Sequence, residues 1–267
     1  MARGGHESRH AFIVMAYGDS PFLPSCLASI AVQSRRSKTL ITTSTPSDFI
    51  KTCGETAGAP VIVNPEQIGI AGDWNFALRA TEARYVTLAH QDDVYVPAYL
   101  ARSLDLLGAS GDAVLAFTGY YEIDDAGHRR RSRISFAKHA LEGAILGTAH
   151  EPPARRMRAF LSLGNPLPCS SVTFDRERLA ERMSGFAFSD AFKSNLDWDA
   201  WLRLLDAGAR FVRTPERLVG RRHNRLTATS ALTREGVRRA EDEAIFRRLW
   251  PRPLADFIAF AYRAGYQ

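Results

Sequence analysis

The first half of the chain alternates short apolar runs with segments whose apolar positions recur at helical spacing. Residues 11–16 are apolar throughout, which is the pattern of a parallel strand buried on both faces. Apolar residues then recur every three or four positions from residue 23 to residue 30. Asp19 or Ser20 is the expected cap of this helix, with Pro21 in its first turn. Further strands are predicted at residues 40–43, 61–63, 85–89 and 113–117.

Helices fill the intervals between those strands. Gly69 opens one helix, for which Asp73 is the expected cap, and Pro97 begins the next. This alternation predicts an α/β fold: a doubly wound, mostly parallel sheet with helices on both faces. Ligands of such sheets bind beyond the carboxyl ends of the strands. The residues expected at those ends are Tyr17, Thr43 and Asp92.

The second half is less regular. Residues 124–150 are rich in charge and predict a loop or excursion, followed by a helix over 154–163 and a strand over 170–174. Trp198, Trp201, Leu202 and Leu205 then form a helical stripe that ends before Gly208. A short strand at 211–212 follows. From residue 233 the chain reads as helix, broken by prolines 251 and 253.

Composition narrows the class of protein. The 267 residues are 45% hydrophobic and 24% charged, as in soluble globular proteins, so disorder of the whole chain is excluded. The formal net charge is +6. It reflects either a solvated basic surface or attraction to an anionic partner, such as a nucleotide diphosphate, a lipid-linked diphosphate or a membrane face. Nucleic acid is not expected as a partner, because the basic residues are scattered and form no recognition motif.

Cysteine usage and hydropathy bear on location. The three cysteines lack CxxC spacing, which argues against a disulfide framework and against a structural zinc site and suits a reducing cytoplasm. Residues 1–10 are polar and basic, so no secretory signal is expected there. No apolar run reaches membrane-spanning length. Any membrane contact would be peripheral.

Two carboxylates follow a strand directly. Asp92 and Asp93 come after the apolar run 85–89, and a pair of carboxylates with substrate phosphates is a common way to hold Mg²⁺ or Mn²⁺. The alternative is that one of them caps the next helix, and an isolated pair of this kind is a weak signal.

Two more clusters carry candidate chemistry. Asp197 and Asp199 begin the Trp-rich helix; either can serve as a general base or simply stabilise the helix amino end. Residues 221–225 hold three arginines and His223, a set suited to phosphate or metal or to a solvated basic loop.

In order and spacing, these segments resemble the family 2 glycosyltransferases of the GT-A fold over residues 10–230. The likeness rests on residues 14–33 (opening strand, tyrosine turn and helix), Asn64 with 69–75, the DxD-like end of 85–93, the base segment 197–204, and Arg222 with His223. Each motif is weak alone. Their order along the chain makes the likeness specific.

The resemblance implies a metal-dependent, inverting glycosyltransferase that moves a sugar from a nucleoside-diphosphate donor to an acceptor hydroxyl. The acceptor would be a saccharide or a lipid-linked molecule in surface polysaccharide or glycolipid synthesis. Asp197 would be the base, and Asp92, Asp93 and His223 would hold Mn²⁺ or Mg²⁺. The donor would contact Ala16, Tyr17, Thr43, Gly69, Asn75, Gln91, Asp92 and Arg222.

By the same likeness, residues 1–9 form a flexible amino terminus and residues 10–230 a single catalytic domain. Within it, 10–120 bind the nucleotide sugar and 121–230 the acceptor, through the turn at 164–170 and the 120–150 excursion. Residues 231–267 form a helical tail. The expected location is cytoplasmic, with peripheral contact at the inner face of the membrane as an option.

The chain departs from the family pattern at four places. Threonine and serine (42–45) replace the acids after the second strand, His90 replaces the first DxD acid, Leu196 replaces a Glu, and Trp74 replaces an Arg. These changes leave the nucleotide open. They also leave open a non-catalytic homologue that binds a sugar nucleotide or a partner protein. A sugar-phosphate nucleotidylyltransferase is disfavoured, because its glycine-rich loop is absent after the first strand, where only Gly18 occurs.

Overall fold

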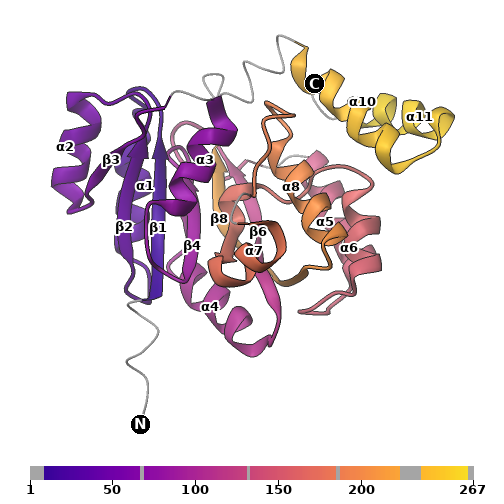
Figure 1. The fold of residues 1–267 in the computed structure, drawn as a ribbon, viewed down its shortest axis with the longest axis horizontal. Helices are drawn as coiled ribbons and strands as arrows, with labels where there is room; N and C mark the ends of the chain where they lie inside the picture. The colour runs from indigo at the N-terminus through magenta and orange to yellow at the C-terminus, as the bar shows by residue number, and fades with distance from the viewer. Residues whose placement is uncertain (1–8, 67–68, 131–132, 185–186, 223–235, 264–267) are drawn as a thin grey trace.

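One eight-stranded sheet runs through the structure, a computed structural model that describes residues 9–263 except 67–68, 131–132, 185–186 and 223–235 (Figure 1). The strand order is β3-β2-β1-β4-β7-β6-β8-β5. The strands are β1 (His10–Ala16), β2 (Lys38–Thr43), β3 (Val61–Val63), β4 (Tyr85–His90), β5 (Val94–Tyr95), β6 (Ala113–Ile123), β7 (Val172–Asp175) and β8 (Arg210–Arg222).

The sheet is mostly parallel, as the alternating pattern predicts. β1 pairs in parallel with β2 and β4, β2 with β3, and β6 with β8. β7 runs antiparallel between β4 and β6, and β5 antiparallel to β8. The sheet includes strands from both predicted halves of the catalytic domain, and β6 crosses the expected boundary at residue 120.

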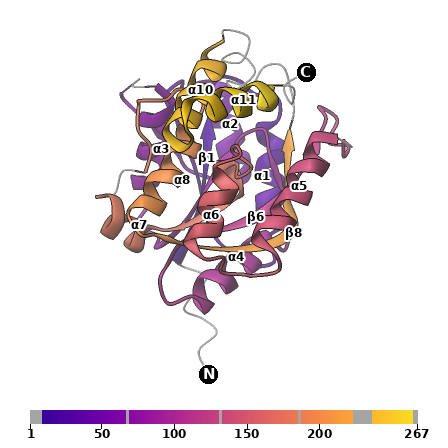
Figure 2. The same cartoon turned by 90° about the vertical axis from the view of Figure 1, so that its right-hand side faces the viewer.

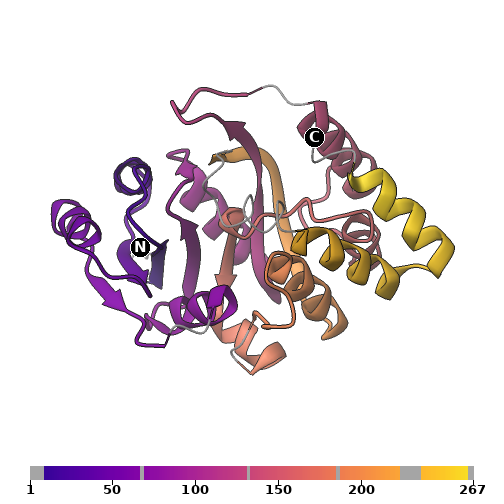
Figure 3. The ribbon, with the colours of Figure 1, turned by 90° about the horizontal axis from the view of Figure 1, so that it is seen from above.

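Helices cover both faces of the sheet (Figure 3). Side chains of β1 alternate between two cores: Ile13 packs with residues of α3, α6 and α8, and Phe12 with residues of α1 and α4. Both faces of β1 are therefore buried, which explains its uninterrupted apolar run. The helices are α1 (Leu23–Ala31), α2 (Asp48–Ala57), α3 (Gly69–Arg79), α4 (Tyr99–Ala109), α5 (Arg133–Leu146), α6 (Ala154–Leu161), α7 (Arg176–Met183), α8 (Leu196–Asp206), α10 (Val237–Leu249) and α11 (Arg252–Arg263).

The carboxy-terminal helices α10 and α11 lie together at one end of the molecule (Figures 1 and 2). They separate at Trp250 and Pro251, so the predicted break at Pro251 is confirmed. Pro253 does not break a helix but lies in the first turn of α11, where a proline is tolerated. No helix in the described ranges is both long and apolar enough to cross a membrane.

The structure corrects two expected helix caps. Ser20 and Asp19 do not cap α1, whose N-cap is Phe22 without a side-chain bond, because Ser20 donates to Asp92 and Asp19 accepts from Ser47. Asp73 likewise does not begin a helix, because α3 already starts at Gly69.

The region expected to be a loop, 124–150, contains α5. Tertiary contacts explain the helix. Glu142 pairs with Arg213 of β8 at 2.6 Å, and the Arg213 side chain is 1% exposed. A buried arginine needs such a partner, so Glu142 serves packing, whereas Asp125, Arg129 and Arg130 of the same segment are exposed.

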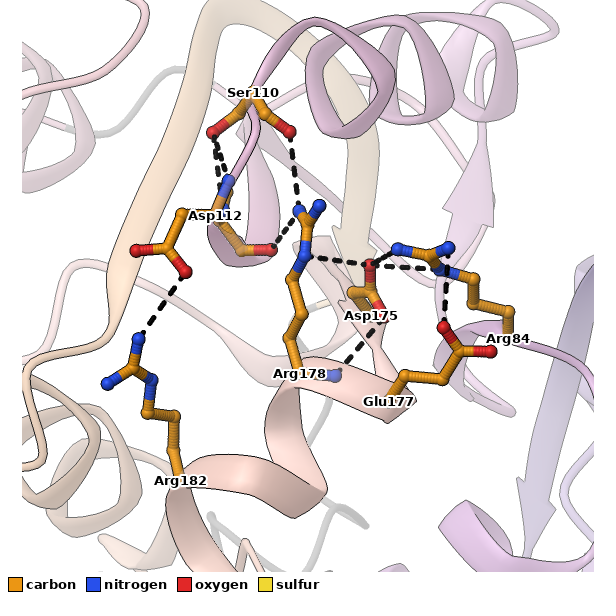
Figure 4. Close-up of polar contacts among 8 residues, drawn as sticks. Arg84, Ser110, Asp112, Asp175, Glu177, Arg178 and Arg182 are labelled. Carbon is orange, nitrogen blue, oxygen red and sulfur yellow. Dashed lines mark hydrogen bonds and ion pairs between the residues drawn. The ribbon is translucent and has the colours of Figure 1, made fainter.

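A second buried carboxylate marks the opposite edge of the sheet. Asp175, at the end of antiparallel β7, is paired with Tyr85 at the amino end of β4. Its carboxylate binds Arg84 at 2.8 Å and Arg178 at 3.5 Å, and Arg178 also donates to the Ser110 carbonyl (Figure 4). This network ties α7 to the sheet and lies away from the strand ends where ligands bind.

Candidate active site

The carboxyl ends of β1, β2 and β4 lie side by side. The register pairs Ala16 with Thr43 and Met15 with His90. The Gln91 amide then joins the loops that follow β1 and β4: it accepts the Tyr17 N–H at 3.1 Å and donates to the Tyr17 carbonyl at 2.9 Å. The Tyr17 side chain itself is 69% exposed, so an aromatic ring stands open at the strand ends.

Hydroxyl groups line the end of β2. Thr45 Oγ1 accepts the Gly18 N–H at 2.8 Å, and Thr43 Oγ1 accepts the Thr45 N–H at 3.0 Å. Gly18 has a φ of 61°, a conformation that favours glycine. The threonines therefore fix the loop after β1 as well as lining the strand end.

An acid from α3 stands beside these hydroxyls. Asp73 accepts from Ser44 at 2.8 Å and from Asn64 at 2.7 Å, so its carboxylate lies beside residues that follow β2 and β3. Sequence reasoning treated Asp73 as a helix cap and found no acid here. Asp73 lies 29 residues further along the chain than Ser44. The sequence signal for this acid was that Asn64 and Asp73 belong to the same family-like segment.

Asp92 and Asp93 are joined to β8 by Arg222. The Arg222 backbone N–H donates to Asp93 Oδ1 and its Nε to the Asp92 carbonyl, each at 3.0 Å. Its Nη1 donates to the carbonyls of Asp124 and Asp125, at 2.5 and 2.9 Å, and the guanidinium lies 4.3 Å from the Phe22 ring centroid. The arginine is 7% exposed, so it braces the two loops and adds positive charge beneath the carboxylates.

The carboxylates of Asp92 and Asp93 differ in their hydrogen-bond partners. Asp92 Oδ1 accepts from Ser20 at 2.7 Å, whereas Asp93 Oδ2 is buried with no hydrogen-bond partner among the described residues. Burial raises the pKa of Asp92, and the Asp93 charge adds to this effect. An unsatisfied carboxylate oxygen beside a second carboxylate fits a hard divalent cation.

In the part of the chain that the structure describes, no group of three or more His, Cys, Asp or Glu is arranged to hold a metal. The expected third ligand, His223, lies outside the described residues. Two carboxylates, completed by phosphate oxygens of a donor, are a common coordination for Mg²⁺.

His90 occupies the middle of the site. Burial lowers its pKa, so the ring is neutral near pH 7, and its Nε2 has no partner among the described residues. The charges of Asp93, Asp197 and Asp92 raise the pKa of His90 and that of Arg221 lowers it, so the strand-end carboxylates and the α8 carboxylate lie near the same ring. His90 and Trp74, two departures from the family pattern, pack on each other with ring centroids 5.1 Å apart.

Asp197 and Asp199 play different parts. Asp199 is 3% exposed, and Arg203 and Arg248 each bind one of its oxygens at 2.6 Å. Asp197 has no ion pair within 4.0 Å among the described residues; its Oδ1 accepts the Trp198 N–H at 2.8 Å. Of the two, only Asp197 is free to take a proton.

The pKa of Asp197 is raised, chiefly by burial. Four groups act in the opposite direction: the charges of Arg238 and Arg221, and hydrogen bonds from Asn165 and from the Trp198 N–H. Asn165 belongs to the 164–170 turn, which the sequence assigned to the acceptor side. Arg221 likewise belongs to the candidate cluster at 221–225, whereas Arg238 lies outside every segment that the sequence singled out.

Three residues predicted to contact the sugar-nucleotide donor, Asn75, Gly69 and Ala16, have surroundings that bear on that role. The Asn75 amide binds both the N–H and the carbonyl of Phe188, at 3.1 and 2.7 Å, so it joins α3 to the segment before α8. Gly69, with a φ of 82°, opens α3. Ala16 is 4% exposed, which leaves mainly its backbone to meet a ligand.

Solved structures with the same arrangement are glycosyltransferases. TarS of S. aureus, residues 1–349 with UDP-GlcNAc, superposes with a TM-score of 0.65 at 14% identity, covering 94% of this chain and 70% of that one. The mannosyltransferase PcManGT of Pyrobaculum calidifontis, with GDP-Man and Mn²⁺, gives 0.64 at 18% identity, covering 97% and 70%.

A third similar structure is the glucosyl-3-phosphoglycerate synthase of Mycobacterium tuberculosis, solved with Mn²⁺, UDP and glucosyl-3-phosphoglycerate. It gives 0.57 at 16% identity, covering 86% of this chain and 81% of that one. The chain spans 42% of a longer TarS structure. No curated protein sequence matches the chain.

The fold is the GT-A fold of these glycosyltransferases. Residues 11–174, more than half of the chain, match the family described as Glycosyl transferase family 2. The chain belongs to that family.

Proposed function

We propose that this glycosyltransferase is metal-dependent and inverting, with a nucleoside-diphosphate sugar as donor and a saccharide or lipid-linked hydroxyl as acceptor. One observation carries the proposal: Asp197, which has no ion pair among the described residues, and Asp93, whose Oδ2 is unsatisfied there, both lie close enough to the buried His90 for their charges to raise its pKa. A base and a cation-binding group on two sides of one site are what displacement of a diphosphate requires.

The chain's own residues supply the proton step. Asp197 takes the proton of the acceptor hydroxyl, and the oxygen attacks the anomeric carbon as the bond to the diphosphate breaks, which inverts that carbon. The diphosphate leaves with the bonding electrons. A divalent ion held by Asp92 and Asp93 would neutralise the charge on it as a Lewis acid.

The surroundings suit both steps. Asn165 and the Trp198 N–H orient the Asp197 carboxylate, and Arg222 supplies fixed positive charge next to Asp92. Fixed charges that need not reorganise are the most effective stabilisers of a developing anion.

The donor's nucleoside is placed at the β1 and β2 ends. Tyr17 offers an exposed ring for stacking, and Thr43, Thr45 and Asp73 offer oxygens for hydrogen bonds. Ala16 and Gly69 would approach through backbone. The similar structures hold UDP in some cases and GDP-Man in another, so the proposal covers both nucleotides. A role in surface polysaccharide or glycolipid synthesis follows from family likeness alone.

A panel of nucleotide sugars, tested by thermal shift with and without Mn²⁺, addresses the proposal directly. One donor should raise the melting temperature by mass action, and EDTA should remove the rise. Nucleoside-diphosphate release from that donor then shows transfer or donor hydrolysis. A shift without any release would favour the non-catalytic homologue, and release of pyrophosphate from a sugar phosphate and a nucleotide would favour a nucleotidylyltransferase.

The metal site has its own test. Asp93→Asn should lower Mn²⁺-dependent donor affinity about tenfold or more in calorimetry, because a charge on a shared cation site is lost. Asp175→Asn, in the network of Figure 4, is the matched control because its carboxylate is also buried but lies at the other edge. Equal donor affinity of Asp93→Asn and the parent, with and without Mn²⁺, would contradict a metal at this position.

A further inference from the structure

Helix α11 carries an apolar face that no other described residue covers. Leu254 is 42% exposed, Phe257 67% and Phe260 71%. Two of the three most exposed large apolar side chains in the described ranges are thus phenylalanines on one helix. Such side chains are rarely left open in clusters on a monomer.

The helix is two-sided. Ala255 and Ala259 are buried against the core, and Tyr262 packs on the same side. At 100° per residue, Leu254, Phe257 and Phe260 point away from that side. The charged residues of α11, Arg252, Asp256 and Arg263, fall together at the border between the two sides. No charge interrupts the exposed apolar face.

The charges around the face favour an anionic surface. Helices α10 and α11 hold six arginines against four acids, and the whole chain carries +6. Asp256, the one acid of α11, is neutralised by Arg247 at 2.9 Å. Arg252 is exposed and makes no ion pair within the described ranges.

We propose that α11 docks the protein peripherally on an anionic lipid surface, with Leu254, Phe257 and Phe260 inserted at the level of the headgroups and Arg252 against lipid phosphates. Amphipathic helices with aromatic residues on one side and arginine at the border bind membranes in this way. Docking is independent of the sugar-transfer reaction proposed above, since it needs neither donor nor metal.

The exposed area argues against a second copy of the chain as the occupant. The three side chains expose on the order of 300 Å² of apolar surface, whereas a stable dimer buries about 800 Å² on each partner. A lipid surface has no such minimum, because each inserted side chain contributes on its own.

The docking helix is also connected to the site. Tyr262, on the buried side of α11, accepts the Asn165 N–H through its hydroxyl at 3.2 Å, and Asn165 hydrogen-bonds Asp197. Gly164 has no side chain because a Cβ there would lie 2.4 Å from the Tyr262 ring. The arrow of β1 in Figure 2 points toward the end where α10 and α11 lie. A docked helix would therefore bring the ligand-binding edge of the sheet close to the membrane.

Co-sedimentation with vesicles tests the proposal. The parent protein should sediment with vesicles of phosphatidylglycerol and phosphatidylcholine in equal parts and much less with phosphatidylcholine alone. The double variant Phe257→Ser with Phe260→Ser should lower the partition coefficient about tenfold or more, because two large apolar side chains no longer insert. Val32→Ser is the matched control, since Val32 is 61% exposed at the end of α1; it should partition like the parent.

Two further measurements distinguish insertion into lipid from self-association of the chain. Phe257→Trp should retain binding, and brominated lipid should quench its fluorescence beyond the quenching of the four native tryptophans. Light scattering without lipid gives the oligomeric state. No sedimentation of the parent with anionic vesicles, or undiminished sedimentation of the double serine variant, overturns the proposal. A parent dimer that the double variant converts to monomer also overturns it and assigns the face to a second copy.

Discussion

Two carboxylates on one helix turn show how neighbouring residues can differ in chemistry. Asp197 and Asp199 share the first turn of α8, yet among the described residues Asp199 lies between two arginines and Asp197 has no ion pair. Burial without a bound cation raises the pKa of Asp197 and leaves an oxygen that can accept a proton. A general base gains from a pKa above that of an ordinary carboxyl group.

The raised pKa of Asp197 gives a pH prediction. The base works only when ionised, so kcat/KM should fall as the pH drops through the Asp197 pKa, with the acid limb above pH 3.8, the ordinary Asp value. The folded state holds this proton more tightly than the unfolded state, so ionisation of Asp197 costs stability as the pH rises through the same window. Asp197→Asn should therefore melt higher than the parent near pH 7, by about 2–4 °C for each kcal/mol relieved.

Thermal melts of both proteins at pH 7 and at low pH check this sign. The difference in melting temperature should shrink as the pH falls below the Asp197 pKa, because both side chains are then neutral. A variant that melts lower than the parent at pH 7 would show that the ionised carboxylate stabilises the fold.

The positions of site residues at the ends of elements were predictable from the sequence only where the apolar pattern marks the element, and their roles stay predictions. Asp92, Asp93 and Asp197 follow strand or helix boundaries that the apolar pattern marks, so their positions could be found. Asp73 could not, because its role depends on contacts with Ser44 and Asn64 across two strands. Gln91 was found as a donor contact, but its two bonds to the Tyr17 backbone come from loop geometry that no spacing encodes. The donor-binding assignments of Gln91 and Asn75 stay predictions.

At the scale of elements, α10 holds the amino end of α8 in place. Glu241 accepts three backbone N–H groups, from Lys193, Ser194 and Asn195, at 2.6 to 2.9 Å. These donors precede or begin α8, where N–H groups lack helical partners and a negative charge is favourable. The helix that carries Asp197 is thus capped by a residue from the carboxy-terminal pair.

Glu241→Gln tests whether this contact positions the base. The neutral Gln side chain has one acceptor oxygen and can satisfy only part of the set of N–H groups. Asp197 should then shift, and kcat should fall about tenfold, while the donor Kd stays unchanged. Glu243→Gln is the control from the same helix, because among the described residues Glu243 binds only arginines of α10 and α11, at 2.6 to 3.8 Å.

The split between kcat and donor Kd separates positioning from general loosening. If both variants lose the same fraction of kcat, or if the loss in Glu241→Gln follows its lowered melting temperature alone, then the contact serves stability and not the base.

Element prediction succeeded where local pattern and tertiary packing agree. The strands of the first half have their expected positions, since continuous apolar runs define them. The α5 helix was missed because its many charges read as a loop, and the partner that absorbs one of them, Arg213, comes from β8. β6 and β8 also extend beyond the short apolar runs that predicted them. The reason is again tertiary, because the two strands pair with each other along ten positions.

At the scale of the whole molecule, the two edges of the sheet formed by the strand ends differ in how fully their polar groups are paired. The edge at the amino ends of β4 and β6 is tied by the Asp175 network (Figure 4), in which every drawn acid has an arginine partner. The edge at the carboxyl ends of β1, β2 and β4 keeps unsatisfied groups, Asp93 Oδ2 and His90 Nε2. Unpaired buried polar atoms cost stability. Others occur singly elsewhere in the described residues, as at Ser103 and Arg213, whereas these two belong to one site at the strand ends.

The central claim is that Asp197 is the base of a sugar-transfer site whose donor lies at this edge. It is tested most directly by measuring donor binding and product formation on the same preparation of Asp197→Asn, with Asp199→Asn as the matched control. The account predicts that Asp197→Asn binds donor as the parent does but loses about 10²–10⁴-fold in kcat, the usual contribution of a general base. Asp199→Asn should lose stability but keep kcat per folded molecule. Near-normal turnover by Asp197→Asn would contradict the account.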